Sequence, residues 1–128
     1  LVEMKRDGSE EPAPLHPAQA LWDRPSRFTT RGELLEAGIQ YFELMGEIPI
    51  VVLRDRSGQP AELQLVRPPR IFPVLSHERL PAGFIYKIGT ESIPLAQEDV
   101  IFIRRPNPMN EHRGLGVVQS LLLQLVGR

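Results

Sequence analysis

The spacing of apolar positions changes near residue 47 and divides the chain into a helical part and a strand part. Between Thr30 and Gly46, apolar residues recur every three or four positions, which is typical of an amphipathic helix. That predicted face consists of Leu34, Leu35, Gly38, Ile39, Phe42 and Met45. From Ile48 onwards, apolar residues alternate with polar ones or form short β-branched runs, which predicts strands.

Both ends of the long helix carry capping signals. Thr30 and Glu33 have the spacing of a capping box, in which each side chain satisfies a free backbone N–H. Gly46 suits the left-handed conformation that ends many helices. Gly38, on the apolar face, predicts that another backbone approaches closely. Glu36 is expected on the solvated side.

A shorter helix is predicted before it. Pro17 suits a first helical turn, and Pro25 disfavours helix at the residue before it. We interpret Trp22, the only tryptophan, as a core residue. Residues 1–16 are mostly polar and predict a flexible lead-in, which leaves 17–128 as the domain.

The strand part begins with a hairpin, in which "RSGQP" supplies the turn between "IPIVVLRD" and "AELQLV". The three prolines of "RPPRIFPVL" predict an extended edge or a loop. "GFIYKI" and "DVIFIRR" add two more strands, and "GTES" is interpreted as a turn. The prediction is an α+β fold with N-terminal helices, a small antiparallel sheet and a C-terminal helix.

The terminal stretch "GVVQSLLLQLVGR" predicts a helix that is apolar on almost every side. A helix of this kind is normally buried all round. Little chain follows it here, and the chain opens on Leu1 rather than Met. We therefore expect a fragment whose polypeptide continues past Arg128, or another subunit that packs against this helix.

Composition narrows the function classes. The chain has 128 residues, enough for one domain, with 41% hydrophobic and 24% charged residues. The net charge of −1 excludes an overall basic field for nucleic acid. The absence of cysteine excludes disulfides, thiolate catalysis and cysteine-zinc sites. No stretch approaches the roughly 18 apolar residues of a membrane span, so no membrane partner is predicted.

The stretch "DVIFIRRPNPMNEHRGLGVVQS" runs from a strand through a glycine-rich turn into a helix, the order in which proteins build phosphate loops. Gly114 and Gly116 are followed by Gln119 where a dinucleotide fingerprint needs its third glycine, and no P-loop pattern occurs. The phosphate interpretation therefore fails on spacing. Stiffened by Pro106 and Pro108, the loop is interpreted as a rigid connection.

Catalytic templates fit no better. The histidines lie far apart and form no metal-binding pair, and neither Ser92 nor Ser120 has a nucleophile context. Glu91, Glu98 and Asp99 lie around predicted turns, where solvated charge is the usual explanation. We predict no catalytic, cofactor-binding or metal-binding residue and no cofactor; the three histidines are His16, His77 and His112.

Arginines gather near the predicted sheet. We interpret them as a solvated face bridged to nearby carboxylates. The alternative is a small nucleic-acid-binding or protein-interaction module that uses these arginines. The arginines are Arg67, Arg70, Arg104 and Arg105, and the carboxylates are Asp55, Glu62 and Asp99.

The order of short motifs resembles the N-terminal part of tailed-bacteriophage portal proteins, over about Pro17 to Gln124. The first half shares an Arg-Pro-x-x-x-x-Thr segment, a helix ending in Gly, a strand ending in Arg-Asp, a Gly-x-Pro turn and a Glu-Leu strand reaching Pro. These elements lie at Arg24–Pro25, Thr30, Gly46, Arg54–Asp55, Gly58–Pro60, Glu62–Leu63 and Pro68. The second half shares Asp99–Val100, Ile103–Arg104 and Gly114–Leu115–Gly116.

Two positions depart from the family pattern. Gly-Asn-Ala-Tyr is frequent after the long helix, whereas this chain has Gly46-Glu47-Ile48-Pro49. Ser-Pro is frequent after the glycine turn, whereas this chain has Val117-Val118.

The resemblance implies a non-enzymatic structural subunit of the wing region, without the stem and clip that lie further along the polypeptide. Portal proteins form a dodecameric ring at one capsid vertex, through which DNA enters and leaves. The implied partners are other copies of the chain, the major capsid or scaffold protein, the terminase large subunit, a head-tail adaptor and non-specifically contacted DNA. The implied location is the virion, with assembly in the host cytoplasm.

Overall fold

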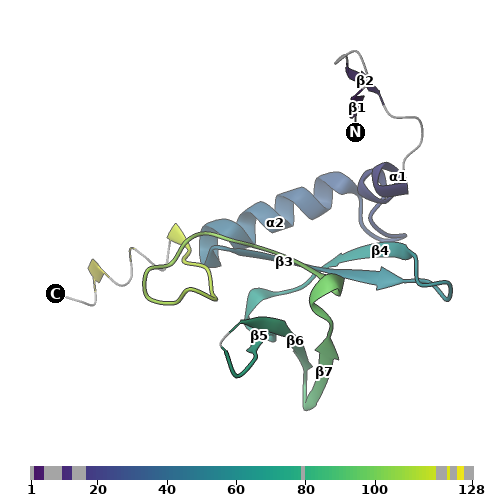
Figure 1. Cartoon of the computed structure of the whole chain (residues 1–128). Coiled ribbons are helices and arrows are strands. Elements are labelled where there is room, and N and C mark those ends of the chain that lie inside the picture. Colours follow the sequence, from purple (N-terminus) through teal and green to yellow (C-terminus); the bar gives the residue numbers. More distant parts are fainter. Residues whose placement is uncertain are drawn as a thin grey trace.

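The computed structural model describes residues 2–4, 10–12, 17–78, 80–117, 121 and 124–125. Within them the fold is α+β, as the sequence predicts. Figure 1 shows helix α2 lying over one face of a small sheet, and a second small sheet lying on the opposite side of the first sheet. In the predicted lead-in, strands β1 (Val2–Met4) and β2 (Glu10–Pro12) pair antiparallel. The division at residue 17 stays a prediction.

The helices begin and end where their capping residues lie. Helix α1 spans Pro17–Asp23 and α2 spans Arg31–Met45. The Thr30 side chain accepts a hydrogen bond from the Glu33 backbone N–H at 3.2 Å. Gly46 caps the other end of α2 in the left-handed conformation, with φ of 73°. The structure confirms Thr30 and Gly46 as the capping residues, and of the two bonds of the predicted capping box it shows the one accepted by Thr30.

The first sheet has the strand order β4-β3-β8 and is antiparallel throughout. Its strands are β3 (Glu47–Arg54), β4 (Pro60–Leu65) and β8 (Val100–Arg104). Asp55 closes the β3–β4 turn, since its carboxylate accepts bonds from the Ser57 hydroxyl at 2.6 Å and the Gln59 N–H at 3.0 Å. These bonds hold the pKa of the Asp55 carboxyl below its usual value.

The second sheet has the order β5-β6-β7. Its strands are β5 (Ile71–Leu75), β6 (Pro81–Ile88) and β7 (Glu91–Leu95); short 3-10 turns at Pro68–Arg70 (η1) and Gln97–Asp99 (η2) precede β5 and β8. Each edge strand contains a proline, Pro73 in β5 and Pro94 in β7, and proline has no backbone N–H to donate to a neighbouring strand. The edge prediction for β5 is confirmed. The interpretation of "GTES" as a turn is wrong for Glu91 and Ser92, which begin β7.

The main core lies between the two sheets. Ile71 is completely buried, and Phe84 packs on Phe102 of the first sheet with ring centroids 5.4 Å apart. The buried cluster is Val51, Val66, Ile71 and Phe84, with Val100 and Phe102 packed against it. The other face of the first sheet carries α2, which packs on β3 and β4.

Three packing predictions need correction. Leu34 and Gly38 of α2 are buried, but Leu35 is 43% and Ile39 57% exposed, because only one side of the predicted face lies over the sheet. The group that approaches Gly38 is the side chain of Ile48, 3.2 Å from where a Cβ would lie, rather than a backbone. Trp22 is 38% exposed and is not a core residue.

The predicted terminal helix is described at five positions only. Val117, Leu121, Gln124 and Leu125 are helical, Gly116 is described but not helical, and the other residues of that prediction lie outside the described residues. Leu121 and Leu125 are exposed. Within the described part of the chain, no helix has the length and apolar character needed to cross a bilayer.

Candidate functional site

The loop after β8 packs backbone against backbone on the end of α2. In Figure 1 the chain leaves β8 and curls back beside the C-terminal end of that helix. A Cβ on Gly114 would overlap the carbonyl oxygen of Gly46, and a Cβ on Gly116 would overlap that of Leu44. The Arg105 N–H donates to the Gly46 carbonyl at 2.7 Å. Close packing therefore accounts for the Gly-Leu-Gly spacing, without any phosphate.

A buried carboxylate lies under this loop. Glu47, the first residue of β3, is 2% exposed. One of its oxygens accepts from Nη2 of Arg113 at 2.8 Å, and the other accepts from the Gly114 N–H at 2.8 Å. Both carboxylate oxygens are thus satisfied by the loop.

Arg113 extends the same network to the second sheet. Its guanidinium also donates to the carbonyl of Ile71 at 2.6 Å and to that of Pro68 at 3.0 Å. The loop, the start of β3 and the start of β5 are therefore joined through one side chain. We call Glu47, Arg113 and Gly114 the loop anchor.

The pKa of Glu47 reflects competing causes. Burial raises it above the ordinary value of 4.5, while the Gly114 N–H and the positive charge of Arg113 lower it and offset part of that rise. The loop partners thus offset part of the cost of burying this carboxylate.

The residues considered for catalysis are not brought together. Asp99 pairs with Arg54 at 2.7 Å, and Ser92 lies in the edge strand β7. His16 and Ser120 lie outside the described residues. Among the residues that are described, no three His, Asp or Glu side chains are grouped so as to hold a metal ion.

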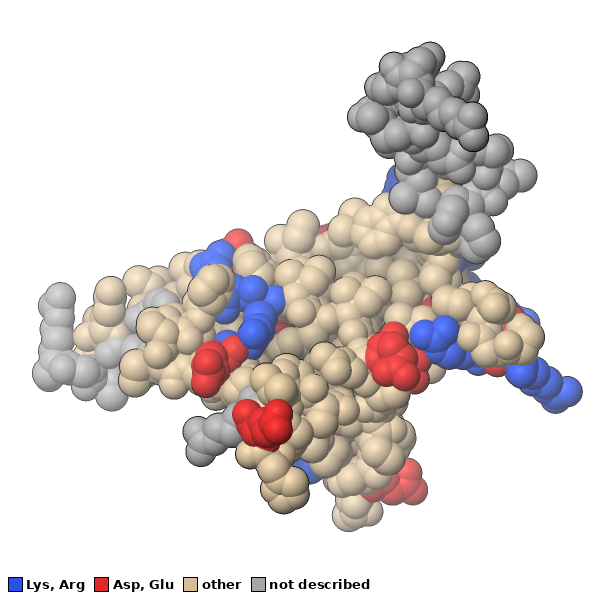
Figure 2. Space-filling model, in the orientation of Figure 1, with Lys and Arg blue, Asp and Glu red and all other residues tan. Residues whose placement is uncertain are grey.

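The arginines do not form one face. Arg104 and Arg105 join Arg113 around a shallow hollow of about 290 Å³, whereas Arg67 and Arg70 lie near η1 and do not line it. On the face in Figure 2, small basic and small acidic groups are interspersed, and one basic group lies directly beside an acidic one.

The predicted pairing with nearby carboxylates is wrong among the described residues. Asp99 forms its ion pair with Arg54 rather than with one of the four predicted arginines, because the Arg54 guanidinium lies 2.7 Å from its carboxylate. Arg104 instead donates to the Glu111 carbonyl, and the Arg105 guanidinium lies 4.9 Å from the Phe42 ring centre.

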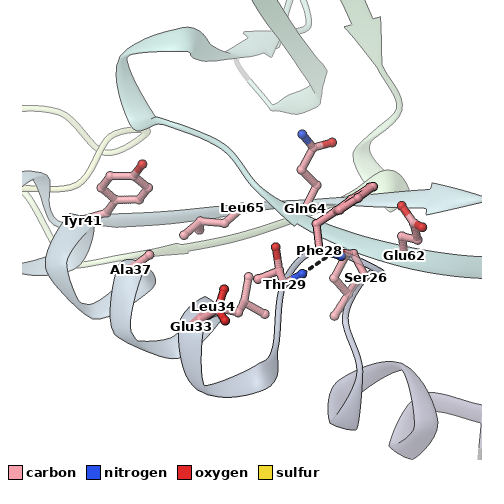
Figure 3. A pocket seen from close by; sticks show the side chains of 11 residues that line it. Ser26, Phe28, Thr29, Glu33, Leu34, Ala37, Tyr41, Glu62, Gln64 and Leu65 are labelled. Atoms are coloured by element: carbon pink, nitrogen blue, oxygen red, sulfur yellow. Dashed lines mark hydrogen bonds between the residues drawn. The ribbon is translucent and has the colours of Figure 1, made fainter.

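A groove of about 470 Å³ lies between α2 and the edge strand β4. Figure 3 shows Ala37 and Tyr41 from the helix and Leu65 from the strand around it, with Phe28 beside its end. Phe28 is 89% exposed. Glu33 and Glu62 also line the groove, and no Lys or Arg does. We call this surface the β4 groove.

An apolar surface lies on the other side of α2. Ile101 and Ile103 of β8 are paired with Ile50 and Ile48 of β3, so they share the sheet face that carries α2. The helix lies over β3 and β4, and these two isoleucines remain 44% and 47% exposed. Together with Leu35 and Ile39 of α2 they form what we call the β8 flank.

Sequence reasoning missed the loop anchor and both surfaces flanking α2. The only local signal for Glu47 is a charged residue between a capping glycine and an apolar strand. Its partners lie more than sixty positions away, and no spacing rule connects them.

Comparison with known proteins gives structural similarity only. No protein-family model and no curated protein matches the chain. A chain from the neck of an empty gene transfer agent particle, computed with C6 symmetry, is similar with a TM-score of 0.77 and 27% identity over 88% of this chain. The virion of a native gene transfer agent particle contains a chain with a TM-score of 0.76 and 26% identity over 86% of this chain.

A third similar chain comes from the neck of a native particle computed with C12 symmetry, with a TM-score of 0.76 and 26% identity over 85% of this chain. This chain spans about a third of the length of those chains, between 31% and 32%. The structural neighbours are thus components of assembled virion particles.

Proposed function

We propose that this chain is part of a structural subunit in the neck of a phage-like particle, and that copies of this subunit form the portal ring. The observation that carries the proposal is the similarity to gene transfer agent neck chains over 88% of this chain. The motif order that resembles portal proteins supports the same role independently.

In this role residues 17–128 form a wing-region domain of a dodecameric ring at the portal vertex of the capsid. The ring is the passage through which DNA is packaged and ejected, and the subunit catalyses no reaction. Its partners are other copies of itself, the major capsid or scaffold protein, the terminase large subunit, a head-tail adaptor and DNA contacted without sequence preference. The loop anchor has a structural role, since it holds the loop after β8 against the C-terminal end of α2.

Electron microscopy of the complete natural polypeptide tests this proposal. Purified protein is expected to form rings with an axial hole. A well-folded monomer at high concentration would contradict it.

The alternative is a nucleic-acid-binding module, and the three arginines around the small hollow are the observation in its favour. All three already have partners: Arg113 pairs with Glu47, Arg105 lies over the Phe42 ring, and Arg104 donates to the Glu111 carbonyl. We expect no saturable binding of a short duplex DNA at about 0.15 M salt, where exposed charges are strongly screened. Tight binding that weakens steeply with salt, and is lost in Arg104→Ala, would favour the module.

A further inference from the structure

The two surfaces flanking α2 lie on opposite sides of the helix. Leu35 and Ile39 are one turn apart and share the side that faces β8. Ala37 and Tyr41, also one turn apart, face β4 and line the β4 groove. The Arg105 guanidinium over Phe42 marks the β8 side independently, because Arg105 directly follows that strand.

The β8 flank exposes four large aliphatic side chains together. Their exposed fractions run from 43% to 57%. Single exposed apolar residues are ordinary, but a contiguous group is typical of an interaction site. They are Leu35, Ile39, Ile101 and Ile103.

The β4 groove complements this flank in charge. Phe28 projects beside the groove almost fully exposed, as an aromatic anchor would. The groove contains the carboxylates Glu33 and Glu62, and the opposite flank carries the cation of Arg105. An acidic, aromatic surface on one side of the helix thus matches a basic, aliphatic surface on the other.

We propose that the β8 flank of one copy packs against the β4 groove of the next copy, with Phe28 seated among the aliphatic residues. The inference rests on the proposed ring and names its subunit contact. A contact between two different surfaces, here on opposite sides of α2, is head-to-tail, and it closes into a ring when the rotation fits. A two-fold dimer would instead place one surface against itself. Similar chains occur in particle necks computed with C6 and C12 symmetry, and a closed ring of more than two identical copies needs head-to-tail contacts.

Introduced cysteines test this contact, because the 128 residues contain none and any cysteine elsewhere in the natural polypeptide is first replaced with serine. The complete natural polypeptide is prepared as Phe28→Cys/Ile101→Cys and as Phe28→Cys/Ile39→Cys, and treated with a short bismaleimide linker. At least one pair is expected to give a ladder of covalent dimers, trimers and larger species on a denaturing gel. Mixing the Phe28→Cys and Ile101→Cys single variants is expected to give dimers only, since each chain then carries a single thiol.

The control is Phe28→Cys/Ile93→Cys, which places the second thiol on the exposed edge strand β7. It is expected to give no ladder. If rings form but neither test pair exceeds this control, the contact is wrong and the ring proposal stands. Abundant dimers from Phe28→Cys alone would show a two-fold contact and overturn the inference. Absence of rings in the unsubstituted protein would overturn both.

Discussion

Replacing Gly114 with alanine is expected to lower the free energy of unfolding by about 3 kcal/mol, the upper end of what overpacking usually costs. The added Cβ would overlap the carbonyl of Gly46 and crowd the Glu47 side chain. That carbonyl cannot move freely, since it belongs to the cap of α2 and accepts the Arg105 N–H. Equilibrium urea unfolding followed by tryptophan fluorescence measures the loss.

Gly32→Ala is the matched control. Gly32 lies in the first turn of α2, and the nearest atom to an added Cβ, the Thr30 hydroxyl, is 4.0 Å away. Alanine favours helix over glycine by up to about 1 kcal/mol, so this variant is expected to match or exceed the parent. If Gly114→Ala were equally well tolerated, the glycine spacing would not be explained by close packing.

Replacing Arg113 with methionine is expected to lower the free energy of unfolding by about 3–5 kcal/mol at neutral pH, the usual cost of breaking a buried ion pair. Methionine keeps an apolar chain but leaves the Glu47 carboxylate, with 3% of its side chain exposed, without its cation. The carbonyls of Ile71 and Pro68 lose a donor as well. Urea unfolding over a pH series measures the effect.

The pH dependence follows from the pKa of Glu47. In the folded chain that pKa already lies above the ordinary 4.5, and loss of the Arg113 charge raises it further. The folded state then holds the proton more tightly than the unfolded state, so stability falls as pH rises from about 4.5 towards the raised pKa. The deficit of Arg113→Met is therefore expected to be largest at neutral pH and to shrink towards pH 4.5.

Adding Glu47→Gln supplies the control for this interpretation. The double variant contains neither the buried charge nor its cation, so it is expected to be more stable at neutral pH than Arg113→Met alone. A deficit in Arg113→Met that stays constant with pH, and that Glu47→Gln does not relieve, would contradict a role based on charge.

Local chemistry made much of the fold predictable. The caps of α2 at Thr30 and Gly46 depend on residues within one turn, and the β3–β4 hairpin depends on the Asp55–Gln59 turn. The division of the strands into two sheets is not local. The sequence does not predict β7, because the polar residues at its start resemble a turn. The strand forms although it contains Pro94, because it pairs with β6.

The features that give the site its character depend on distant contacts. The sequence predicts a rigid loop around Gly114, but it does not show that Gly114 packs on Gly46 at the C-terminal end of α2. The apolar period of α2 places Leu35 and Ile39 on one face with Leu34, whereas the structure buries only Leu34 of these three. It could not show that β8 lies too far to the side to be covered, which leaves those residues exposed.

Electron microscopy of the complete natural polypeptide tests the central claim most directly. Negative-stain images of purified protein are expected to show rings with an axial hole, and rotational averaging is expected to give twelve copies or another closed cyclic number. Double-cysteine variants that cross-link into a ladder would then assign the contact between copies. A folded monomer at every concentration examined would contradict the portal-ring account.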